Sequence, residues 1–194
     1  MQQMSDEALM LEYQKGEARA MDELLLRYKN PVYRFAFRLC SNASEAEDIA
    51  QEVFLRVHQY RGNYRPTGKF STWIFSIAHN LFVSSLRKRK WQALWPRQDQ
   101  DSGEPVDFPS LAPSPREVVV ESDVSTVVSR CIQSLPFLQK EALILREYEH
   151  LEYQEIADIL NKPQGTIKTL IYRARESLKA KLLPYIEEMR GGTR

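Results

Sequence analysis

A segment without helical or strand periodicity divides this chain and limits every fold that it can adopt. Residues 96–117 hold five prolines and few large apolar side chains. Because proline lacks a backbone donor and polar, proline-rich stretches bury little apolar surface, the segment predicts an extended, flexible linker. Residues 1–95 and 118–194 must then each build a hydrophobic core of their own. We therefore expect two small domains.

Apolar residues recur at helical spacing on both sides of this linker. Alternating strand patterns are almost missing from the sequence, and it has seven glycines in 194 residues. The pattern predicts an all-α fold with two small helical domains. The helices that we expect cover residues 5–15, 18–43, 44–60 and 71–90 in the first domain, and 116–134, 136–149, 153–160 and 163–189 in the second.

The charge is unevenly distributed although the net charge is only +1. Residues 1–95 carry 14 Lys and Arg against 10 Asp and Glu, whereas residues 96–117 carry 2 against 5. In residues 118–194 the two kinds are equal, at 11 each. The near-neutral total thus conceals basic clusters and an acidic linker, so nucleic acid stays a candidate partner.

Several classes of protein are disfavoured by what the sequence lacks. No leader pattern or long apolar run predicts export or a membrane span, which favours a cytoplasmic protein. Cys40 and Cys131 are far apart and form no Cys-x-x-Cys pair, while the histidines are scattered. No phosphate-binding glycine motif is present. We expect no metal, no cofactor and no enzymatic activity.

The expected helix 44–60 has a capping signal and two distinct faces. Ser44 followed by Glu47 matches a capping box, which predicts that the helix begins there. Its polar face, which includes Glu47 and Arg56, is by itself typical of a solvated surface. Its buried stripe is expected to consist of Ile49, Val53, Phe54 and Val57.

The expected helix 71–90 is apolar at its start and ends in four consecutive cations, Arg87 to Lys90. Aromatic rings, amides and cations together suit an unpaired nucleic-acid strand, although cations at a helix C-terminus also favour the helix dipole. The preceding loop, which contains Arg61, could hold a flipped base or be an ordinary connector. We expect a buried stripe of Phe70, Trp73, Ile74, Ile77, Leu81 and Leu86, with Phe75, His79, Asn80, Ser84 and Ser85 off that stripe.

Residues 153–189 have the pattern of a helix-turn-helix. A short amphipathic helix is followed by Asn161, which tolerates a left-handed backbone, and then by a longer helix that is polar and basic near its start. A charged helical hairpin is the alternative. Ile156, Ala157 and Leu160 are expected to pack on Ile167, Leu170, Ile171 and Ala174, with Gln164, Thr166, Lys168, Thr169, Tyr172, Arg173 and Arg175 left outside.

Taken in order, these segments resemble the extracytoplasmic-function (ECF) sigma factors, the small two-domain branch of the bacterial sigma-70 family. The resemblance rests on the runs AEDIAQEVFLRV and FSTWIFSIAHN, the basic helix end, the linker, SLP at 134–136 and YQEIADILNKPQGTIKTLIYRARESL. It covers nearly the whole chain. It implies a promoter-specificity subunit of bacterial RNA polymerase, with residues 1–95 opening the minus-10 element and residues 118–194 binding the minus-35 duplex.

The resemblance also implies roles for individual residues. Asp48, Gln51, Glu52, Phe54 and Leu55 map to the surface that docks on the clamp helices of the largest polymerase subunit. Tyr64, Arg65, Lys69, Trp73, Asn80, Arg87, Lys88, Arg89 and Lys90 map to minus-10 DNA binding. Thr166, Lys168, Thr169, Tyr172, Arg173 and Arg175 map to minus-35 DNA binding.

The partners that the resemblance implies are the polymerase core, including the flap of its second subunit, promoter DNA, and an anti-sigma factor that is often held at the membrane. Glu152 stands where a capping serine is common, at the start of the expected helix 153–160. Gln164 and Leu170 also depart from the usual residues, which leaves the minus-35 sequence open. A stand-alone helix-turn-helix repressor, a nucleic-acid-processing enzyme and a helical interaction protein are the competing hypotheses.

Overall fold

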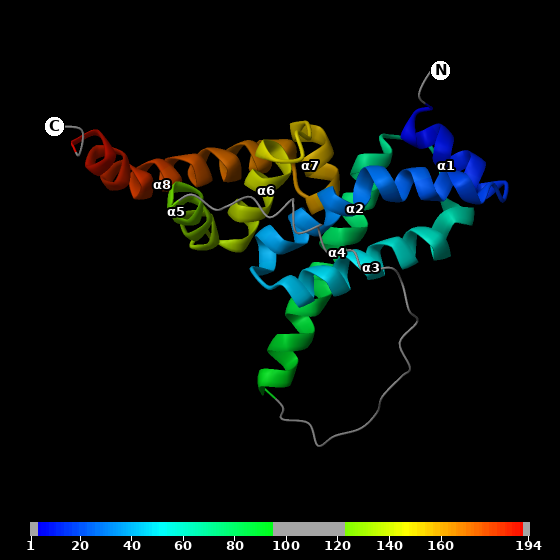
Figure 1. Ribbon diagram of the computed structural model, residues 1–194, viewed down its shortest axis with the longest axis horizontal. Coiled ribbons are helices and arrows are strands. Elements are labelled where there is room, and N and C mark those ends of the chain that lie inside the picture. The colour runs from blue at the N-terminus through cyan, green and yellow to red at the C-terminus, as the bar shows by residue number, and fades with distance from the viewer. Residues whose placement is uncertain (1–3, 95–122, 192–194) are drawn as a thin grey trace. The chain divides into compact units, whose positions relative to one another are not determined.

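The structure, a computed structural model, describes residues 4–94 and 123–191 (Figure 1). Within these ranges it contains eight α-helices and one 3-10 turn, and it contains no strand there. The all-α prediction is therefore confirmed. The chain divides into two compact units, built mainly from α1 to α4 and from α5 to α8. The predicted linker, residues 96–117, lies outside the described residues.

The helices of the first unit agree with the prediction to within a few residues. The predicted helix 18–43 ends three residues early, at Cys40, and the next begins at Ala43, so Ser44 lies inside the first turn and does not cap it. The capping-box prediction at Ser44 was wrong, because Asn42 precedes α3 and Ser44 is the second residue of the helix. The elements are α1 (Asp6–Gln14), α2 (Ala18–Cys40), α3 (Ala43–Tyr60), η1 (Arg61–Asn63) and α4 (Phe70–Leu94).

Local chemistry defines both ends of α1. The Ser5 hydroxyl accepts a hydrogen bond from the Ala8 N–H at 3.2 Å, which satisfies one of the free donors at the helix start. After the helix, Gly16 has a φ of +102°, a region that residues with a Cβ rarely adopt. The chain can therefore turn sharply there into α2.

Helix α4 packs with a buried arc that differs from the predicted stripe. Phe75, expected off the stripe, is only 2% exposed, and its ring centroid lies 5.3 Å from that of Phe35 on α2. Because α4 contacts α1, α2 and α3, its buried arc is displaced around the helix. Trp73, Ile77, Leu81 and Leu86 are half-buried, whereas the buried residues are Phe70, Ile74, Phe75, Ala78 and Phe82.

In the second unit the end of α5, at Gln133, lies one residue before the predicted end. The helix begins at Asp123, and residues 116–122 of the predicted helix 116–134 lie outside the description. The following helices agree closely with the prediction, and α7 agrees at both ends. The elements are α5 (Asp123–Gln133), α6 (Phe137–Glu147), α7 (Tyr153–Leu160) and α8 (Gln164–Gly191).

The helix-turn-helix seam between α7 and α8 is confirmed. Asn161 follows α7 with a φ of 49°, in the left-handed region that the sequence predicted. Glu152 precedes the helix, and its N–H donates to the Glu155 carboxylate at 2.7 Å, so the helix is capped without a serine. Leu170 is half-buried, while Ile156, Ala157, Leu160, Ile167, Ile171 and Ala174 are buried as predicted.

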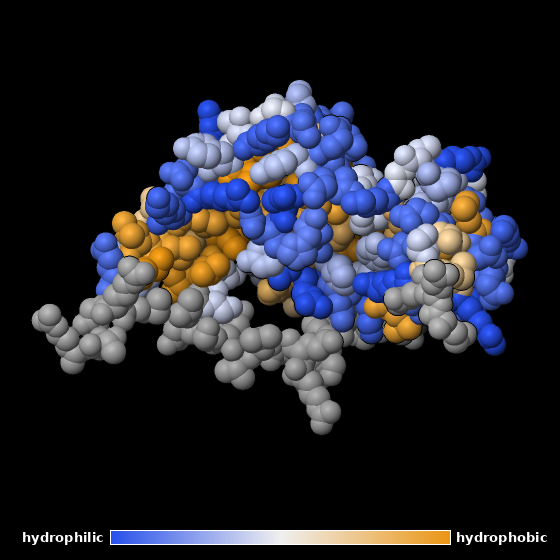
Figure 2. Space-filling model, turned by 90° about the horizontal axis from the view of Figure 1, so that it is seen from above, coloured by the Kyte–Doolittle hydropathy of each residue, from blue (hydrophilic) through white to orange (hydrophobic). Residues whose placement is uncertain are grey.

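Hydrophilic residues cover much of the face seen in Figure 2, interrupted by apolar areas in orange. The last turns of α8 expose large apolar side chains, among them Leu183 and Ile186. Over residues 4–94 and 123–191, none of the helices is both long and apolar enough for a membrane span.

Candidate nucleic-acid interface

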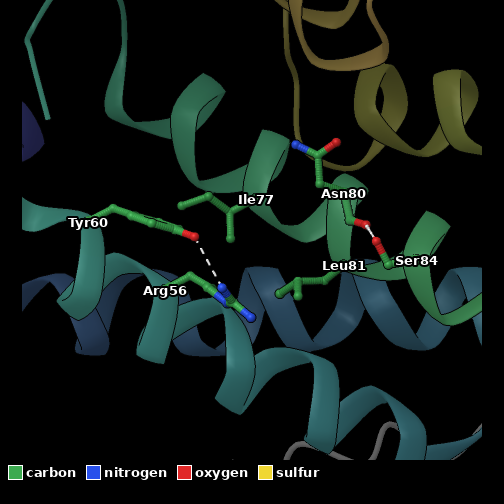
Figure 3. Close-up of a pocket in the computed structure, with 6 residues that line it drawn as sticks. All are labelled: Arg56, Tyr60, Ile77, Asn80, Leu81 and Ser84. Carbon is green, nitrogen blue, oxygen red and sulfur yellow. Dashed lines mark hydrogen bonds between the residues drawn. The ribbon is translucent and has the colours of Figure 1, made fainter. Parts of the chain in front are cut away.

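A pocket of about 300 Å³ opens between the end of α3 and the middle of α4 (Figure 3). Its size is at the lower end of ordinary small-molecule pockets, which span about 300–1,000 Å³. Apolar surface comes from Ile77 and Leu81, and polar groups come from both helices. The lining residues are Arg56, Tyr60, Ile77, Asn80, Leu81 and Ser84. A flat ring with polar edges, such as a nucleobase, matches this mixture.

The polar groups of the pocket are held in place by short-range bonds. Arg56 donates to the Glu52 carboxylate at 2.6 Å and to the Tyr60 hydroxyl at 3.1 Å. The Ser84 hydroxyl donates to the Asn80 carbonyl at 2.7 Å. Hydrogen bonding to Glu52 and Tyr60 raises the pKa of the Arg56 guanidinium, which therefore stays charged.

Asn80 lines the pocket, and in Figure 3 its side-chain amide points away from Arg56, Tyr60 and Leu81. It is exposed in the middle of α4, and within the described ranges its side chain makes no hydrogen bond. An amide offers a donor and an acceptor side by side, which is the pattern needed to read the edge of a base. This predicted site residue therefore lies where an unpaired base could reach it.

Tyr64, a predicted minus-10 residue, lies in the core instead. It is only 3% exposed, and its ring centroid is 4.9 Å from Trp73 and 6.1 Å from Phe70. Burial, assisted by the negative charges of Glu7 and Asp6, raises the pKa of its phenol to about 12. Its ring packs against the start of α4 and is not available for stacking on a base.

The Tyr64 hydroxyl is buried with no hydrogen-bond partner in the described part of the chain. Such a group costs about 1–3 kcal/mol, so Tyr64→Phe should stabilise the fold by up to about 1 kcal/mol and leave transcription intact. Tyr64→Ala, which also removes the ring, should cost about 3–5 kcal/mol. Denaturant unfolding and run-off transcription measure both effects. A stable Tyr64→Phe protein that loses transcription would show that the hydroxyl reads DNA.

The loop before α4 presents two of the predicted cations. Arg65 and Lys69 are exposed, and Arg65 donates to the carbonyls of Gly62 at 3.1 Å and Tyr64 at 2.9 Å. Arg87 and Lys88 are exposed further along α4. Arg89 and Lys90 belong to the same helix, but their side chains lie outside the description.

The predicted polymerase-binding face lies on α3. Asp48 is exposed and Gln51, Glu52 and Leu55 are half-buried, so this face of α3 is accessible and offers three polar side chains beside one leucine. Phe54 is 5% exposed and belongs to the core, as the apolar stripe predicted. A direct contact between its side chain and a partner is therefore not supported by this geometry.

The predicted minus-35 residues all lie on the outer side of α8. Tyr172 is 65% exposed, and Lys168 Nζ lies 5.9 Å from the ring centroid of Tyr153. Arg175 donates through Nε to Glu147 at 3.1 Å, and this bond raises the pKa of its guanidinium. Arg175 is thus partly neutralised before any phosphate arrives. The exposed residues are Thr166, Lys168, Thr169, Tyr172, Arg173 and Arg175.

Two contributors to the pocket were missed by sequence reasoning. Arg56 was assigned to a solvated face, and Tyr60 was treated as a helix end. Their i, i+4 spacing on α3 was a signal that they share one face. Over residues 4–94 and 123–191, no cluster of three His, Cys, Asp or Glu could hold a metal ion.

Comparison with known proteins identifies both units. Sigma-70 region 2 matches residues 24–92, and Sigma-70 region 4 matches residues 125–178. The RNA polymerase sigma-H factor of Pseudomonas aeruginosa is 32% identical, over 96% of this chain and 98% of its own length. The ECF sigma factor SigW of Bacillus subtilis is 32% identical, over 87% and 91%. The ECF sigma-E factor of Escherichia coli is 30% identical, over 95% and 98%.

Solved structures agree with this assignment at the level of the fold. The sigma factor RpoE, crystallised with the anti-sigma factor NepR from Bartonella quintana, has a TM-score of 0.66 at 24% identity, covering 83% of this chain and 95% of that one. CnrH, in complex with the cytosolic domain of CnrY, has a TM-score of 0.67 at 19% identity, covering 91% and 96%. The chain therefore belongs to the ECF RNA polymerase sigma factors of the sigma-70 family.

Proposed function

We propose that this chain binds the core of bacterial RNA polymerase, recognises the minus-35 and minus-10 elements of its promoters and promotes DNA melting. The observation that carries the proposal is a pair of exposed surfaces on two separate units, whose side chains suit contacts with DNA. One is the pocket beside Asn80, and the other is the outer side of α8. The chain carries out no covalent step in this role.

The pocket is the proposed site for one unpaired minus-10 base. Ile77 and Leu81 contact its apolar faces, while the Asn80 amide reads its edge. Arg65 and Lys69 in the preceding loop, and the cations from Arg87 to Lys90, neutralise nearby phosphates. Tyr64 and Trp73 support the loop and the start of α4 through their ring contact.

Replacement of Asn80 tests this site. Asn80→Ala should lower open-complex formation by about 5-fold to 100-fold, because loss of a base contact costs about 1–3 kcal/mol. The loss should depend on which base faces the pocket in a template with a pre-melted minus-10 segment. Gln59→Ala is the matched control, because Gln59 is an exposed amide on α3 outside the pocket lining. Equal transcription by the two variants would contradict the proposed site.

The exposed polar face of α3 is the proposed docking surface for the clamp helices of the largest polymerase subunit. Asp48, Gln51 and Glu52 supply polar contacts there, with Leu55 beside them, and Phe54 supports the surface from within the core. In the second unit, the exposed apolar residues at the end of α8 suit a further protein contact, which we assign to the flap of the second polymerase subunit.

Control by an anti-sigma factor is proposed because two solved structures with a similar fold are complexes with a second protein. The solved structure of RpoE holds that sigma factor with the anti-sigma factor NepR, and CnrH was solved in complex with the cytosolic domain of CnrY. An inhibitor of this kind would cover the same surfaces that polymerase needs. We place the chain in the cytoplasm, where such an inhibitor could hold it at the inner membrane face.

A further inference from the structure

The loop that carries Arg65 and Lys69 is held at both ends by one helix, α1. This loop runs from Arg61, after α3, to Lys69, before α4. None of the residues that the family resemblance assigns to DNA lies on α1. Side chains of α1 nevertheless hydrogen-bond to the backbone at the start of the loop and directly after its end.

Gln14 holds the first end of the loop. Its side-chain amide donates to the carbonyls of Arg61 and Tyr64, with 2.9 Å to the Tyr64 oxygen. These two carbonyls flank the 3-10 turn that leads from α3 into the loop. One amide group therefore fixes both sides of that turn, which is part-buried at this contact.

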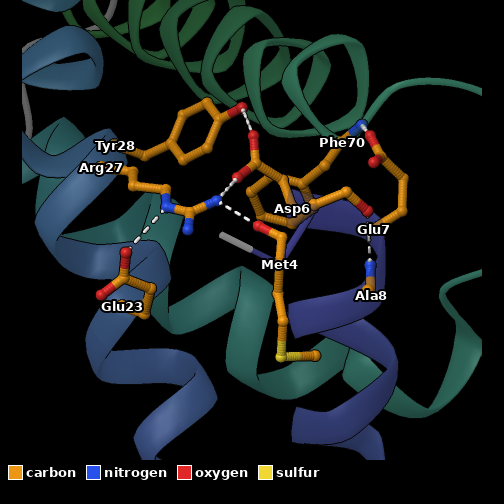
Figure 4. Close-up of polar contacts among 9 residues, drawn as sticks. Met4, Asp6, Glu7, Ala8, Glu23, Arg27, Tyr28 and Phe70 are labelled. Carbon is orange, nitrogen blue, oxygen red and sulfur yellow. Dashed lines mark hydrogen bonds and ion pairs between the residues drawn. The ribbon is translucent and has the colours of Figure 1, made fainter. Parts of the chain in front are cut away.

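Glu7 holds the other end. Its carboxylate accepts a hydrogen bond from the N–H of Phe70, the first residue of α4, at 2.8 Å (Figure 4). A negative group at a helix N-terminus is favoured by the helix dipole. Burial acts to raise the pKa of Glu7, but hydrogen bonds from backbone and Ser5, together with the charge of Lys69, outweigh it and lower that pKa. The group is thus charged at neutral pH.

Helix α1 is itself anchored away from the loop. Asp6 accepts hydrogen bonds from Arg27 and from the Tyr28 hydroxyl, both at 2.6 Å, and both partners lie on α2 (Figure 4). Leu9 and Met10 are buried, so α1 is also packed into the core of the first unit. The position of α1 is therefore set by α2 and the core, and α1 can impose a position on the loop.

We propose that α1 positions the minus-10 reading surface, with Glu7 and Gln14 as positioning residues that fix the loop 61–69 and the first turn of α4. A loop that is ordered before DNA arrives loses little conformational entropy on binding, and its cations and the pocket keep a constant geometry. This inference rests on the proposed function of the pocket. It predicts that selectivity for the unpaired base depends on residues that never touch it.

The variants Gln14→Ala and Glu7→Ala in the full chain test this role. With core polymerase, each should lower discrimination between the preferred and a substituted base in a pre-melted minus-10 template by about tenfold, as for loss of a buried hydrogen-bond partner. Affinity for core polymerase and for the minus-35 duplex should be unchanged. Glu12→Ala is the matched control on α1, because among the described residues the Glu12 side chain bonds only to its neighbour Lys15.

A variant that lowers stability without touching the anchors shows whether the anchor variants act only by destabilising the first unit. Leu24→Ala removes a fully buried side chain from α2 and leaves both loop anchors in place. At equal fraction folded it should retain base discrimination, whereas the anchor variants lose it. In the free chain, amide hydrogen exchange of residues 61–69 should be faster in Gln14→Ala than in Glu12→Ala.

Three results would overturn the proposal: discrimination equal to that of Glu12→Ala, an equal loss in Leu24→Ala, or unchanged exchange in the loop. If the unmodified chain initiates with core polymerase and the anchor variants behave as the control does, the proposed role of α1 is refuted. The proposed function of the chain is then unaffected. If the unmodified chain fails to initiate, the proposed function fails and this inference fails with it.

Discussion

Replacing Lys168 and Arg173 together by glutamate is expected to lower transcription from minus-35-dependent promoters by about 30-fold or more. Both residues are exposed on the outer side of α8, and the seam beneath them is buried independently of their charges. Each contact to a base or its backbone is worth about 1–3 kcal/mol, so two losses give at least about 2 kcal/mol. Run-off transcription at fixed salt measures the effect.

The matched control carries the same change of charge further along the helix. Lys179 and Lys181 are also exposed on α8, beyond the turns that hold the proposed reading residues. Their replacement by glutamate should reduce transcription far less. If the two double variants lose activity equally, general electrostatic attraction explains the binding and the assignment of Lys168 and Arg173 is contradicted.

Phe70→Ala is expected to lower the stability of the first unit by about 3–5 kcal/mol, as much as Tyr64→Ala. The side chain is fully buried at the first residue of α4, and its ring centroid lies 5.1 Å from Tyr28 and 5.7 Å from Trp73. Its removal leaves a cavity where the loop, α2 and α4 meet. Because domains are stable by only about 5–15 kcal/mol in total, much of the stability of this unit should be lost.

The two units should respond differently to that substitution. Chemical denaturation followed by hydrogen exchange should show early unfolding of α1 to α4, while the minus-35 duplex still binds to α8. A control at an exposed apolar site of the same unit, Leu26→Ala, should change stability by less than about 1 kcal/mol. A Phe70→Ala protein as stable as that control would contradict the packing described for the start of α4.

Much of the fold could be predicted from sequence because its signals are local. Helical spacing located all the helices of the described residues, and Asn161 located the turn before α8 because few residues tolerate its left-handed backbone. The start of α3 was missed by one residue. A capping pattern such as Ser44–Glu47 does not by itself determine the first residue of a helix, because helix boundaries vary by one or two residues around such a signal.

The site was less predictable because it depends on contacts between distant segments. Phe75 was expected outside the buried stripe, yet it packs on Phe35 from α2. Tyr64 was assigned to DNA, yet its ring contacts Trp73 in the core. The spacing of apolar residues within one helix cannot show how many neighbouring helices pack against it, or on which sides. The bonds from Glu7 and Gln14 to the loop likewise join residues 63 and 50 positions apart.

Reconstituted transcription tests the central claim most directly. The purified chain is added to core polymerase that lacks any sigma factor, on a library of genomic fragments, with no inhibitor present. The account predicts start sites that share two upstream motifs, with initiation sensitive to Asn80→Ala and to the Lys168 and Arg173 substitutions. Initiation no more specific than that of core polymerase alone would contradict it.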